Sequence, residues 1–288
     1  MAIQLQFRGT ENAVVDLSKL SEAFTKSPDL ESLKRTLVPV GNRMEAFGEL
    51  FQISGNFSDS SQHWSGNMRN VDGLGACHSD GELFVEGDVG NRFASRMHGG
   101  TVRIHGNVGH GAGAAMAGGI LAINGNAGDR IGAAETPSGR GMNRGTIIVN
   151  GSVGDLAGFR MRRGNLLVSR MAKLGGFQML AGTICSQEPL LTDAGDEMRR
   201  GTIVTLATQA RDEFPKSSRR FSYSGEFRLL GIKVWLAFMI NLLESTSLHQ
   251  KGFEEWHEAL AKAQDSIWTL LHGDRTVLNK GEILLRAG

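Results

Sequence analysis

The side chains that most often carry chemistry, eight histidines in this sequence, have no regular spacing. They are His63, His78, His98, His105, His110, His249, His257 and His272. His105 and His110 flank one corner of a repeated unit, but a metal site needs three or four converging ligands. No Ser/His/Asp or Cys/His arrangement has a recognisable context either. We therefore interpret the histidines as surface residues and predict neither a catalytic residue nor a metal site.

The glycine-rich stretch Gly109–Met116 looks like part of a phosphate-binding loop. Such a loop should join one strand to a helix inside a βαβ unit. Here the stretch is one copy of a repeat, and no helical pattern follows it. We reject nucleotide binding, although backbone amides at such corners could bind an anion.

Arginines gather on one side of the repeated unit, mostly after its second glycine corner. They are Arg92, Arg96, Arg130, Arg140, Arg144, Arg160, Arg162 and Arg163. Stacked repeats would bring some of them to one face, where bidentate contacts hold an acidic partner or a polyanion. We take Arg160, Arg162 and Arg163 as the candidate anion-binding face. The alternative is that the arginines serve solubility and pair with nearby acids.

Six of the eleven methionines occupy one register of the repeat, three residues before the next leading glycine. They are Met97, Met116, Met142, Met161, Met179 and Met198. Thioethers could bind a soft metal, but methionine also fills irregular gaps in cores. Because no cysteine or histidine recurs with this column, we predict that it is structural.

A repeat from residue 81 to residue 201 positions all of these side chains. Its leading glycines are Gly81, Gly100, Gly119, Gly145, Gly164, Gly182 and Gly201, mostly 19 residues apart with one longer step of 26. Apolar and polar residues alternate after each, as in a strand with one buried face. Glycine corners follow at Gly87, Gly106, Gly125 and Gly151, and we expect a structural role there because glycine adopts backbone angles that other residues resist.

A period of about 19 residues indicates a solenoid, in which each turn is buried only against its neighbours. At about 3.3 Å per residue one turn has a perimeter of roughly 60 Å. We therefore predict an all-β core, a right-handed parallel β-helix of three sides. A leucine-rich repeat would instead show asparagine-punctuated leucines and a helical half.

The third position of each strand faces outward and is mostly apolar. It holds Phe84, Arg103, Ala122, Ile148, Leu167, Cys185 and Val204. Such a stripe would either form a contact surface for a partner or be covered by the termini of the chain. The sequence leaves both interpretations open.

Three parts are expected along the chain: an N-terminal cap at 1–47, the β-helix at 48–210 and a C-terminal segment at 211–288. Gly48–Phe57 matches the repeat, and residues 58–80 form a compressed unit. Within the C-terminal segment we expect a helical hairpin at about 233–279. Its first helix, Ile232–Leu243, is apolar nearly all round and should be buried. Its second runs from Gly252 to Gly273, and the pair could plug the open end of the solenoid.

Composition restricts the kinds of partner. With 31 basic and 30 acidic residues the net charge is +1, and one tyrosine makes a poor stacking platform, so we expect no nucleic acid. Cys77 and Cys185 fit no metal or redox spacing, which favours free thiols in a reducing cytoplasm. We expect no signal peptide and no membrane span, because the longest apolar run, Leu229–Leu243, is short and interrupted.

The unit Gly-x-Leu-x-Val-x-Gly-Asp/Asn-Val-Gly, with Met-x-x-Gly after it, resembles the C-type subunit of formylmethanofuran dehydrogenase and of the related bacterial formyltransferase/hydrolase complex. It is also similar to the C-terminal domain of the glutamate synthase large subunit. The resemblance covers residues 48–205 and is strengthened by Arg220–Phe227 and Lys280–Arg286. In the family such segments lie close together, so we interpret Lys233–Asn279 as an insertion whose function cannot be carried over.

The resemblance implies a non-catalytic scaffold subunit. The complex moves formyl groups between tetrahydromethanopterin and a methanofuran-type cofactor and releases formate. The implied partners are an amidohydrolase-like subunit, its B-type partner and a formyltransferase subunit. No cofactor is expected on this chain alone, and a cofactor tail that carries glutamates is one conceivable ligand for the arginine face.

Three alternatives stay open. The chain could be the C-type subunit of a molybdenum- or tungsten-containing formylmethanofuran dehydrogenase, or a free-standing enzyme with a histidine-bound metal. It could also be a glutamate-synthase-like spacer domain. Such a domain normally follows catalytic regions, whereas here the repeat begins near the start of the sequence, which favours the formyl-transfer scaffold.

Overall fold

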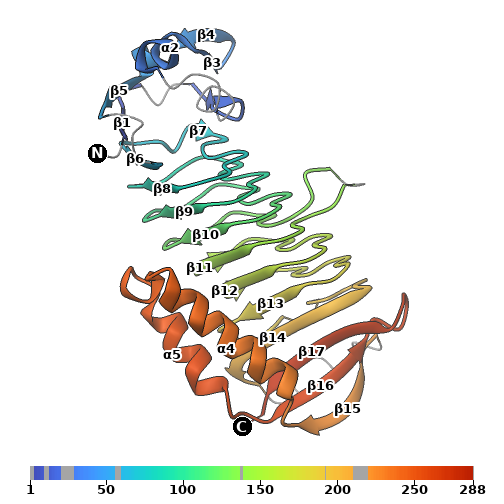
Figure 1. The fold of residues 1–288 in the computed structure, drawn as a ribbon. Coiled ribbons are helices and arrows are strands. Elements are labelled where there is room, and N and C mark those ends of the chain that lie inside the picture. The colour runs from blue at the N-terminus through green and yellow to red at the C-terminus, as the bar shows by residue number, and fades with distance from the viewer. Residues whose placement is uncertain are drawn as a thin grey trace.

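The computed structural model describes residues 3–9, 13–20, 29–55, 60–136, 139–191, 193–209 and 220–287. Figure 1 shows these residues as a column of stacked coils, with helices beside its C-terminal half. The sequence also suggests a short helix at 17–24, an insertion near 135–141 and a charged linker at 211–220. Of these segments, residues 21–24, 137–138 and 211–219 lie outside the described residues.

A sheet of 13 strands runs along the column in the order β15-β16-β17-β14-β13-β12-β11-β10-β9-β8-β6-β1-β5. From β6 to β14, and on to β17, every neighbouring pair is parallel. These strands are β6 (Ser61–Ser65), β8 (Glu82–Val85), β9 (Thr101–Ile104), β10 (Ile120–Ile123), β11 (Thr146–Val153), β12 (Asn165–Met171), β13 (Thr183–Ser186), β14 (Arg200–Thr208) and β17 (Lys280–Arg286). The predicted mostly-β, mostly parallel architecture with helices near the C-terminus is confirmed.

The repeat stays in register from one coil to the next. Leu83 pairs with Val102, and Val102 pairs with Leu121. The second and fourth strand positions are buried in one continuous core: Leu83, Val102, Leu121, Ile147, Leu166, Ile184 and Ile203, with Val85, Ile104, Ile123, Val149 and Val168. Fully burying such a side chain is worth about 1.5–3 kcal/mol, so the period-2 alternation fixes which face of each strand points inward.

Each coil contacts the next on other sides as well. Parallel bridges join Val89 to Val108 and Val108 to Ala127. The turn-rich segment that follows also bonds between coils, since the Arg92 and Arg96 amides donate to the carbonyl groups of His110 and Ala114, both at 2.7 Å. Bonds between coils on several sides satisfy backbone groups that a buried coil would otherwise leave without partners.

The N-terminal end of the column is closed by two further strands of the large sheet and by a smaller sheet. Strand β1 (Ile3–Phe7) pairs in parallel with β6 and antiparallel with β5 (Phe51–Ser54). A smaller sheet contains β2 (Val15–Asp16), β3 (Leu37–Val40), β4 (Arg43–Ala46) and β7 (Val71–Asp72), and two short helices are α2 (Leu30–Arg35) and α3 (Phe47–Leu50).

The prediction that Gly48–Phe57 forms a parallel repeat strand was therefore wrong. Phe47, Phe51 and Trp64 are fully buried, and their ring centroids lie 4.5–6.1 Å apart. This aromatic cluster covers the first coil. The local sequence pattern resembles the repeat, but Gly48–Leu50 lies in α3, and Phe51–Ser54 forms a strand antiparallel to β1.

The C-terminal end continues the sheet with antiparallel strands. Strand β17 pairs with β16 (Trp268–Gly273), which pairs with β15 (Ser222–Phe227). The predicted second helix was too long, because α5 ends at Ala263 and Ile267 and Leu270 lie outside it. Hydrogen bonding to β17 makes Trp268–Gly273 a strand despite its helix-like spacing of apolar residues.

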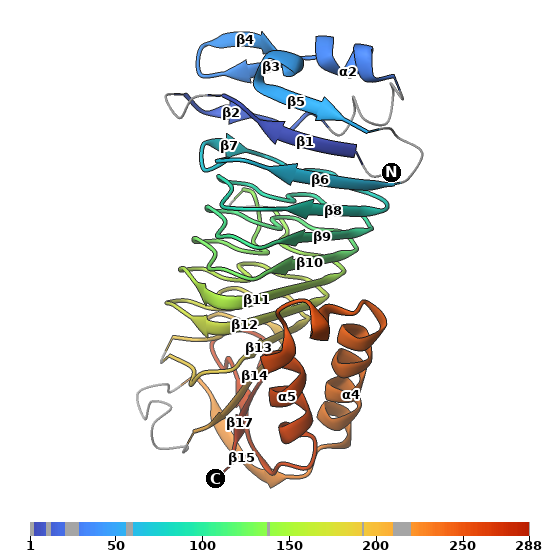
Figure 2. The ribbon, with the colours of Figure 1, turned by 90° about the vertical axis from the view of Figure 1, so that its left-hand side faces the viewer.

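The helices α4 (Leu230–Ser245) and α5 (Glu254–Ala263), joined through the short 3₁₀ helix η1 (Leu248–Gln250), lie against the outer face of the sheet (Figure 2). They form one cluster with the outward residues Ala122, Ile148, Leu167, Cys185 and Val204. The apolar stripe is thus covered by the chain itself over this part. The prediction that the helices plug the open end was wrong, since that end is occupied by β15–β17.

Among the described residues, no helix combines the length and apolar character needed to cross a membrane.

Candidate functional site

The histidines take separate local roles. His63 stacks on Phe84 with ring centroids 5.1 Å apart, His257 lies 2.9 Å from a Glu244 carboxylate oxygen, and His272 contacts the Ser224 hydroxyl at 2.7 Å. His78 is buried, and burial lowers the pKa of its imidazole. Within the part of the chain that the structure describes, no three His, Cys, Asp or Glu side chains form a group that could hold a metal.

His110 belongs to a ladder of side chains that accept backbone N–H groups of the following coil. Oδ1 of Asn91 accepts the His110 amide at 2.9 Å, and Nδ1 of His110 accepts the Asp129 amide at 3.0 Å. The same contact is made before and after by Asp72, Asp129 and Asp155. Nδ1 must be unprotonated to accept this bond, so His110 works here as a structural acceptor.

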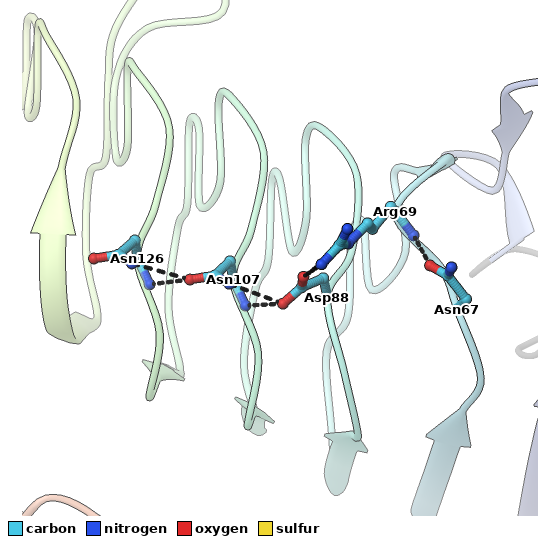
Figure 3. A network of polar contacts seen from close by, with 5 residues as sticks. All are labelled: Asn67, Arg69, Asp88, Asn107 and Asn126. Atoms are coloured by element: carbon cyan, nitrogen blue, oxygen red, sulfur yellow. Dashed lines mark hydrogen bonds and ion pairs between the residues drawn. The ribbon is translucent and has the colours of Figure 1, made fainter. Parts of the chain in front are cut away.

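A second ladder is formed by the residues that directly follow the corner glycines, and Figure 3 shows its first members. Oδ1 of Asp88 accepts the Asn107 amide at 2.7 Å, and Oδ1 of Asn107 accepts the Asn126 amide at 2.8 Å. Arg69 closes the end through Asp88 at 2.7 Å. The Asp and Asn residues after the corner glycines thus bond successive coils together, a role that the corner composition alone does not reveal.

The corner glycines are required chiefly by close stacking. The sequence led us to expect unusual backbone angles at all four. Of these four glycines only Gly87 has a positive φ, at 93°. A Cβ on Gly125 would lie 2.6 Å from the Gly106 carbonyl oxygen, and one on Gly151 would lie 2.6 Å from that of Gly125. At most of these corners a larger residue is therefore excluded because its Cβ atom would clash with a carbonyl group of the preceding coil.

The methionine column is fully buried, with Met97, Met116, Met142, Met161, Met179 and Met198 all 0% exposed. Each of the first five reaches under the leading glycine of the next coil. A Cβ on Gly119 would lie 2.6 Å from the Met97 methyl carbon, and one on Gly201 would lie 2.8 Å from that of Met179. The methionines and leading glycines are therefore matched pairs in the core.

The predicted arginine side divides into paired and unpaired residues. Arg92 contacts Asp16 at 3.0 Å, Arg96 contacts Glu135 at 3.1 Å, and Arg130 donates to the Ala134 carbonyl group at 2.8 Å. These three arginines form contacts within the chain that stabilise the fold. Arg140, Arg144, Arg162 and Arg163 make no ion pair with a residue that the structure describes.

Of the three predicted anion-binding residues, the structure groups two. Arg162 and Arg163 adjoin Gly164, and both their amides donate to the Met142 carbonyl group. Arg160 stands in another register, with a φ of 54°, and its buried Nε has no hydrogen-bond partner among the described residues. The sequence prediction omitted Arg199 and Arg200, although they precede Gly201 as Arg162 and Arg163 precede Gly164. It could not have found Lys280, because only the pairing of β17 with β14 brings Lys280 beside Arg200.

The outer face of α4 is the main exposed apolar surface near the helices. Leu230, Val234 and Phe238, spaced four residues apart, are 74%, 61% and 52% exposed. The opposite face, with Ile232, Leu236, Met239 and Leu243, is buried. The expectation that the whole helix is buried was therefore wrong. The three residues of this stripe are apolar. The charged residues of α4 contact α5 and the loop after it, since Lys233 lies 2.7 Å from Asp265 and Glu244 lies 2.9 Å from His257.

A pocket beyond the helices joins the uncovered part of the outward stripe. It lies between Phe84, Arg103 and the segment from Ser245 to Lys251. The Arg103 guanidinium lies over the Phe84 ring at 4.8 Å, and its Nε is buried without a partner in the described chain. Glu82 and Lys251 also line this pocket, so its lining holds two basic residues and one acidic residue.

Comparison with known proteins shows a full-length relationship. No protein-family model matches the sequence, and no curated protein matches it. The structure is similar to a chain in the crystal structure of the formyltransferase/hydrolase complex (FhcABCD) from Methylorubrum extorquens in complex with methylofuran, with a TM-score of 0.82 and 28% identity. The match covers 99% of this chain and 100% of that chain. The predicted resemblance is confirmed: the chain is related to a component of that complex.

Proposed function

We propose that this chain is a non-catalytic scaffold subunit of a formyltransferase/hydrolase complex. The observation that carries the proposal is the end-to-end match to a chain of such a complex, at 28% identity. A match over 99% of the chain includes the helices as well as the repeat. In detail, we assign the chain to the position of the C-type subunit and its coils to a right-handed parallel β-helix, in agreement with the parallel register of β6 to β14.

The activity proposed for the assembly is transfer of formyl groups between tetrahydromethanopterin and a methanofuran-type cofactor, with release of formate. The amidohydrolase-like subunit, its B-type partner and the formyltransferase subunit supply the reacting groups, and the assembly works in the cytoplasm. The crystal structure of the related complex contains methylofuran. We assign no reacting atom to the present chain, whose role is to hold partners in place.

The scaffold role requires a surface for a partner, and α4 offers one. Leu230, Val234 and Phe238 expose an uncharged apolar stripe that is unfavourable in water. A pocket beside the start of α4, lined by Leu229, Trp235 and other residues, would accept an apolar side chain of the partner. We infer that another subunit of the complex covers this stripe.

The test is affinity purification of the full chain from its native cells, followed by mass spectrometry. We expect recovery of an amidohydrolase-like subunit and a formyltransferase. Molybdenum- or tungsten-containing partners would instead move the chain to a formylmethanofuran dehydrogenase. Recovery of the chain alone as a stable monomer would overturn the scaffold role.

Paired variants test the interface. Val234→Glu with Phe238→Glu should lose the partner that covers α4, because two charges would be buried without counter-ions. Ser32→Glu with Asn42→Glu adds the same charge at exposed positions near the N-terminal end and should retain all partners. Equal recovery of partners with both double variants would show that α4 is not the interface.

A further inference from the structure

A pocket lies on the outer face of the column, next to the place where the helical cover begins. Phe84 and Arg103, the outward residues of β8 and β9, line it together with residues 245–248 and Lys251 from the connection between α4 and α5. The next outward residue, Ala122 on β10, is already packed against the helices. The cavity has a volume of about 330 Å³. Because a water molecule takes about 30 Å³ in the liquid, the pocket has room for a small organic molecule.

Arg103 gives this pocket a cation that is held in place and lacks an acceptor. The central carbon of its guanidinium lies 4.8 Å from the centroid of the Phe84 ring. An aromatic ring attracts a cation but offers no oxygen atom to its N–H groups. Nε of Arg103 is buried without a hydrogen-bond partner among the described residues. A buried donor without an acceptor costs free energy, so the site favours a ligand that supplies one.

The lining of the pocket has a net positive charge. Lys251 is a second, half-buried cation, and Glu82 is the one acid among the lining residues. Glu82, Arg103 and Lys251 form no ion pair with one another or with any other residue that the structure describes. The lining therefore carries a net charge of +1, which one monoanionic group neutralises. The hydroxyl-bearing residues Thr101 and Ser247 also line the pocket and provide further polar contacts.

We propose that this pocket binds a single carboxylate group, carried by a small organic acid or by an acidic side chain of another protein. A guanidinium matches a carboxylate in bidentate geometry. Along the outward stripe Arg103 is preceded by Phe84 and followed by Ala122, so the stripe offers no adjacent cation for an extended polyanion. A phosphate dianion would exceed the net charge of the lining.

The lining also favours a carboxylate that has a short apolar group attached. Leu83 and Leu248 are buried and line the pocket, and contact with their carbon atoms removes apolar surface of the ligand from water. Propionate combines one negative charge with such a group and is the probe we choose. The proposal rests on this pocket alone and not on the proposed formyl-transfer function.

The test is a saturation-transfer NMR titration of the purified full chain with propionate, at pH 7 and low salt in a buffer without carboxylates. We expect saturable transfer with a Kd on the order of 1–10 mM. Propionamide, which has nearly the same shape and no charge, should give no saturable transfer. Inorganic phosphate should displace propionate only at higher concentration than propionate itself.

Variants of the lining assign the binding to this pocket. Arg103→Gln should weaken propionate binding about tenfold or more, because it removes the charge and the paired donors. Glu82→Gln should strengthen binding about two- to threefold, because it removes the acid of the lining. Arg35→Gln makes the same charge change as Arg103→Gln at an exposed site on α2 and should alter the Kd less than about twofold.

Melting temperatures of all variants separate loss of binding from loss of fold. If Arg103→Gln does not fold, Lys251→Gln takes its place, with an expected weakening of about threefold. The proposal is overturned by a folded chain that shows no saturation by about 50 mM propionate, by equal transfer to propionamide, or by tighter binding of phosphate. An unchanged Kd in folded Arg103→Gln, or in folded Lys251→Gln where that variant takes its place, would overturn it as well.

The same titration on the complex purified from native cells distinguishes the two sources of the carboxylate. Transfer that depends on Arg103 in both the isolated chain and the complex identifies a free acid as the ligand. Transfer that depends on Arg103 in the isolated chain and is absent from the complex shows that a partner's acidic side chain fills the pocket.

Discussion

Nε1 of Trp235 on α4 donates a 2.8 Å hydrogen bond to Oδ1 of Asn165 on β12. Nε1 of Trp256 on α5 donates to the Val149 carbonyl oxygen at 3.3 Å. The two indoles help to fix both helices to the sheet, together with the bond from the Arg286 guanidinium to the Lys262 carbonyl oxygen at 3.1 Å. Cys185 lies beneath them and is fully buried, and burial raises the pKa of its thiol.

Trp235→Phe should loosen this helical cover. The change keeps an aromatic ring but removes the donor to Asn165, and losing one such bond typically costs about 1 kcal/mol. Opening of the cover should then be about fivefold more frequent. The measurement is the rate at which a thiol reagent labels Cys185 in a Cys77→Ser background. Val234→Ala, on the exposed face of the same helix, should leave the rate unchanged. Fast labelling of Cys185 in the parent chain would contradict a closed cover.

Gly125→Ala should destabilise the column by about 1–3 kcal/mol, the usual range for an overpacked site. Its Cβ would meet the Gly106 carbonyl oxygen at 2.6 Å, and a backbone atom of the preceding coil cannot move aside cheaply. Gly231→Ala on α4 is the matched control, because nothing lies within 4 Å of its Cβ position. Alanine there should stabilise the helix by up to about 1 kcal/mol. Urea unfolding midpoints of the two variants should move in opposite directions.

The coils could be predicted from sequence because their determinants are local and repeated. A residue such as Ile104 is buried because it is the fourth after its leading glycine, and the same reasoning holds nineteen residues later at Ile123. The methionine register was visible for the same reason. Its geometric cause, the methyl group under the glycine of the next coil, required the stacked structure.

The parts that could not be predicted depend on contacts between distant segments. Arg92 seemed available for a ligand, but Asp16, which is 76 residues away, pairs with it. Trp268–Gly273 has helix-like spacing, and its pairing with β17 decides that it is a strand. Lys280 lies beside Arg200 only because β17 pairs with β14, although more than seventy residues separate the two strands in the sequence.

His110→Asn should preserve stability, whereas His110→Ala should lower it by about 1 kcal/mol. The reason is the ladder, in which Nδ1 of His110 accepts the Asp129 amide at 3.0 Å. Asparagine provides an acceptor at the same place, as Asn91 does one coil earlier, and alanine provides none. The measurement is the urea unfolding midpoint of the parent chain and of both variants at pH 8, where a free imidazole is neutral. Equal loss in both variants would assign His110 some role other than that of an acceptor.

Asp88→Asn tests the charge at the end of the second ladder. The Asn107 amide, opposed by partial burial and aided by Arg69, lowers the pKa of the Asp88 carboxyl group below its ordinary value of 3.8. A lowered pKa means that the ionised group stabilises the fold above about pH 4 and that this contribution is lost as pH falls through the folded-state pKa.

The asparagine of Asp88→Asn keeps the acceptor for the Asn107 amide and loses the ion pair with Arg69. The parent chain should therefore be slightly more stable than Asp88→Asn at pH 7, and the difference should shrink as pH falls below about 4. Urea midpoints between pH 7 and pH 3 measure it, with the exposed Asp80→Asn as the control for net charge. A difference that stays constant with pH would mean that Asp88 acts only as a hydrogen-bond acceptor, like Asn107 and Asn126 in the coils that follow.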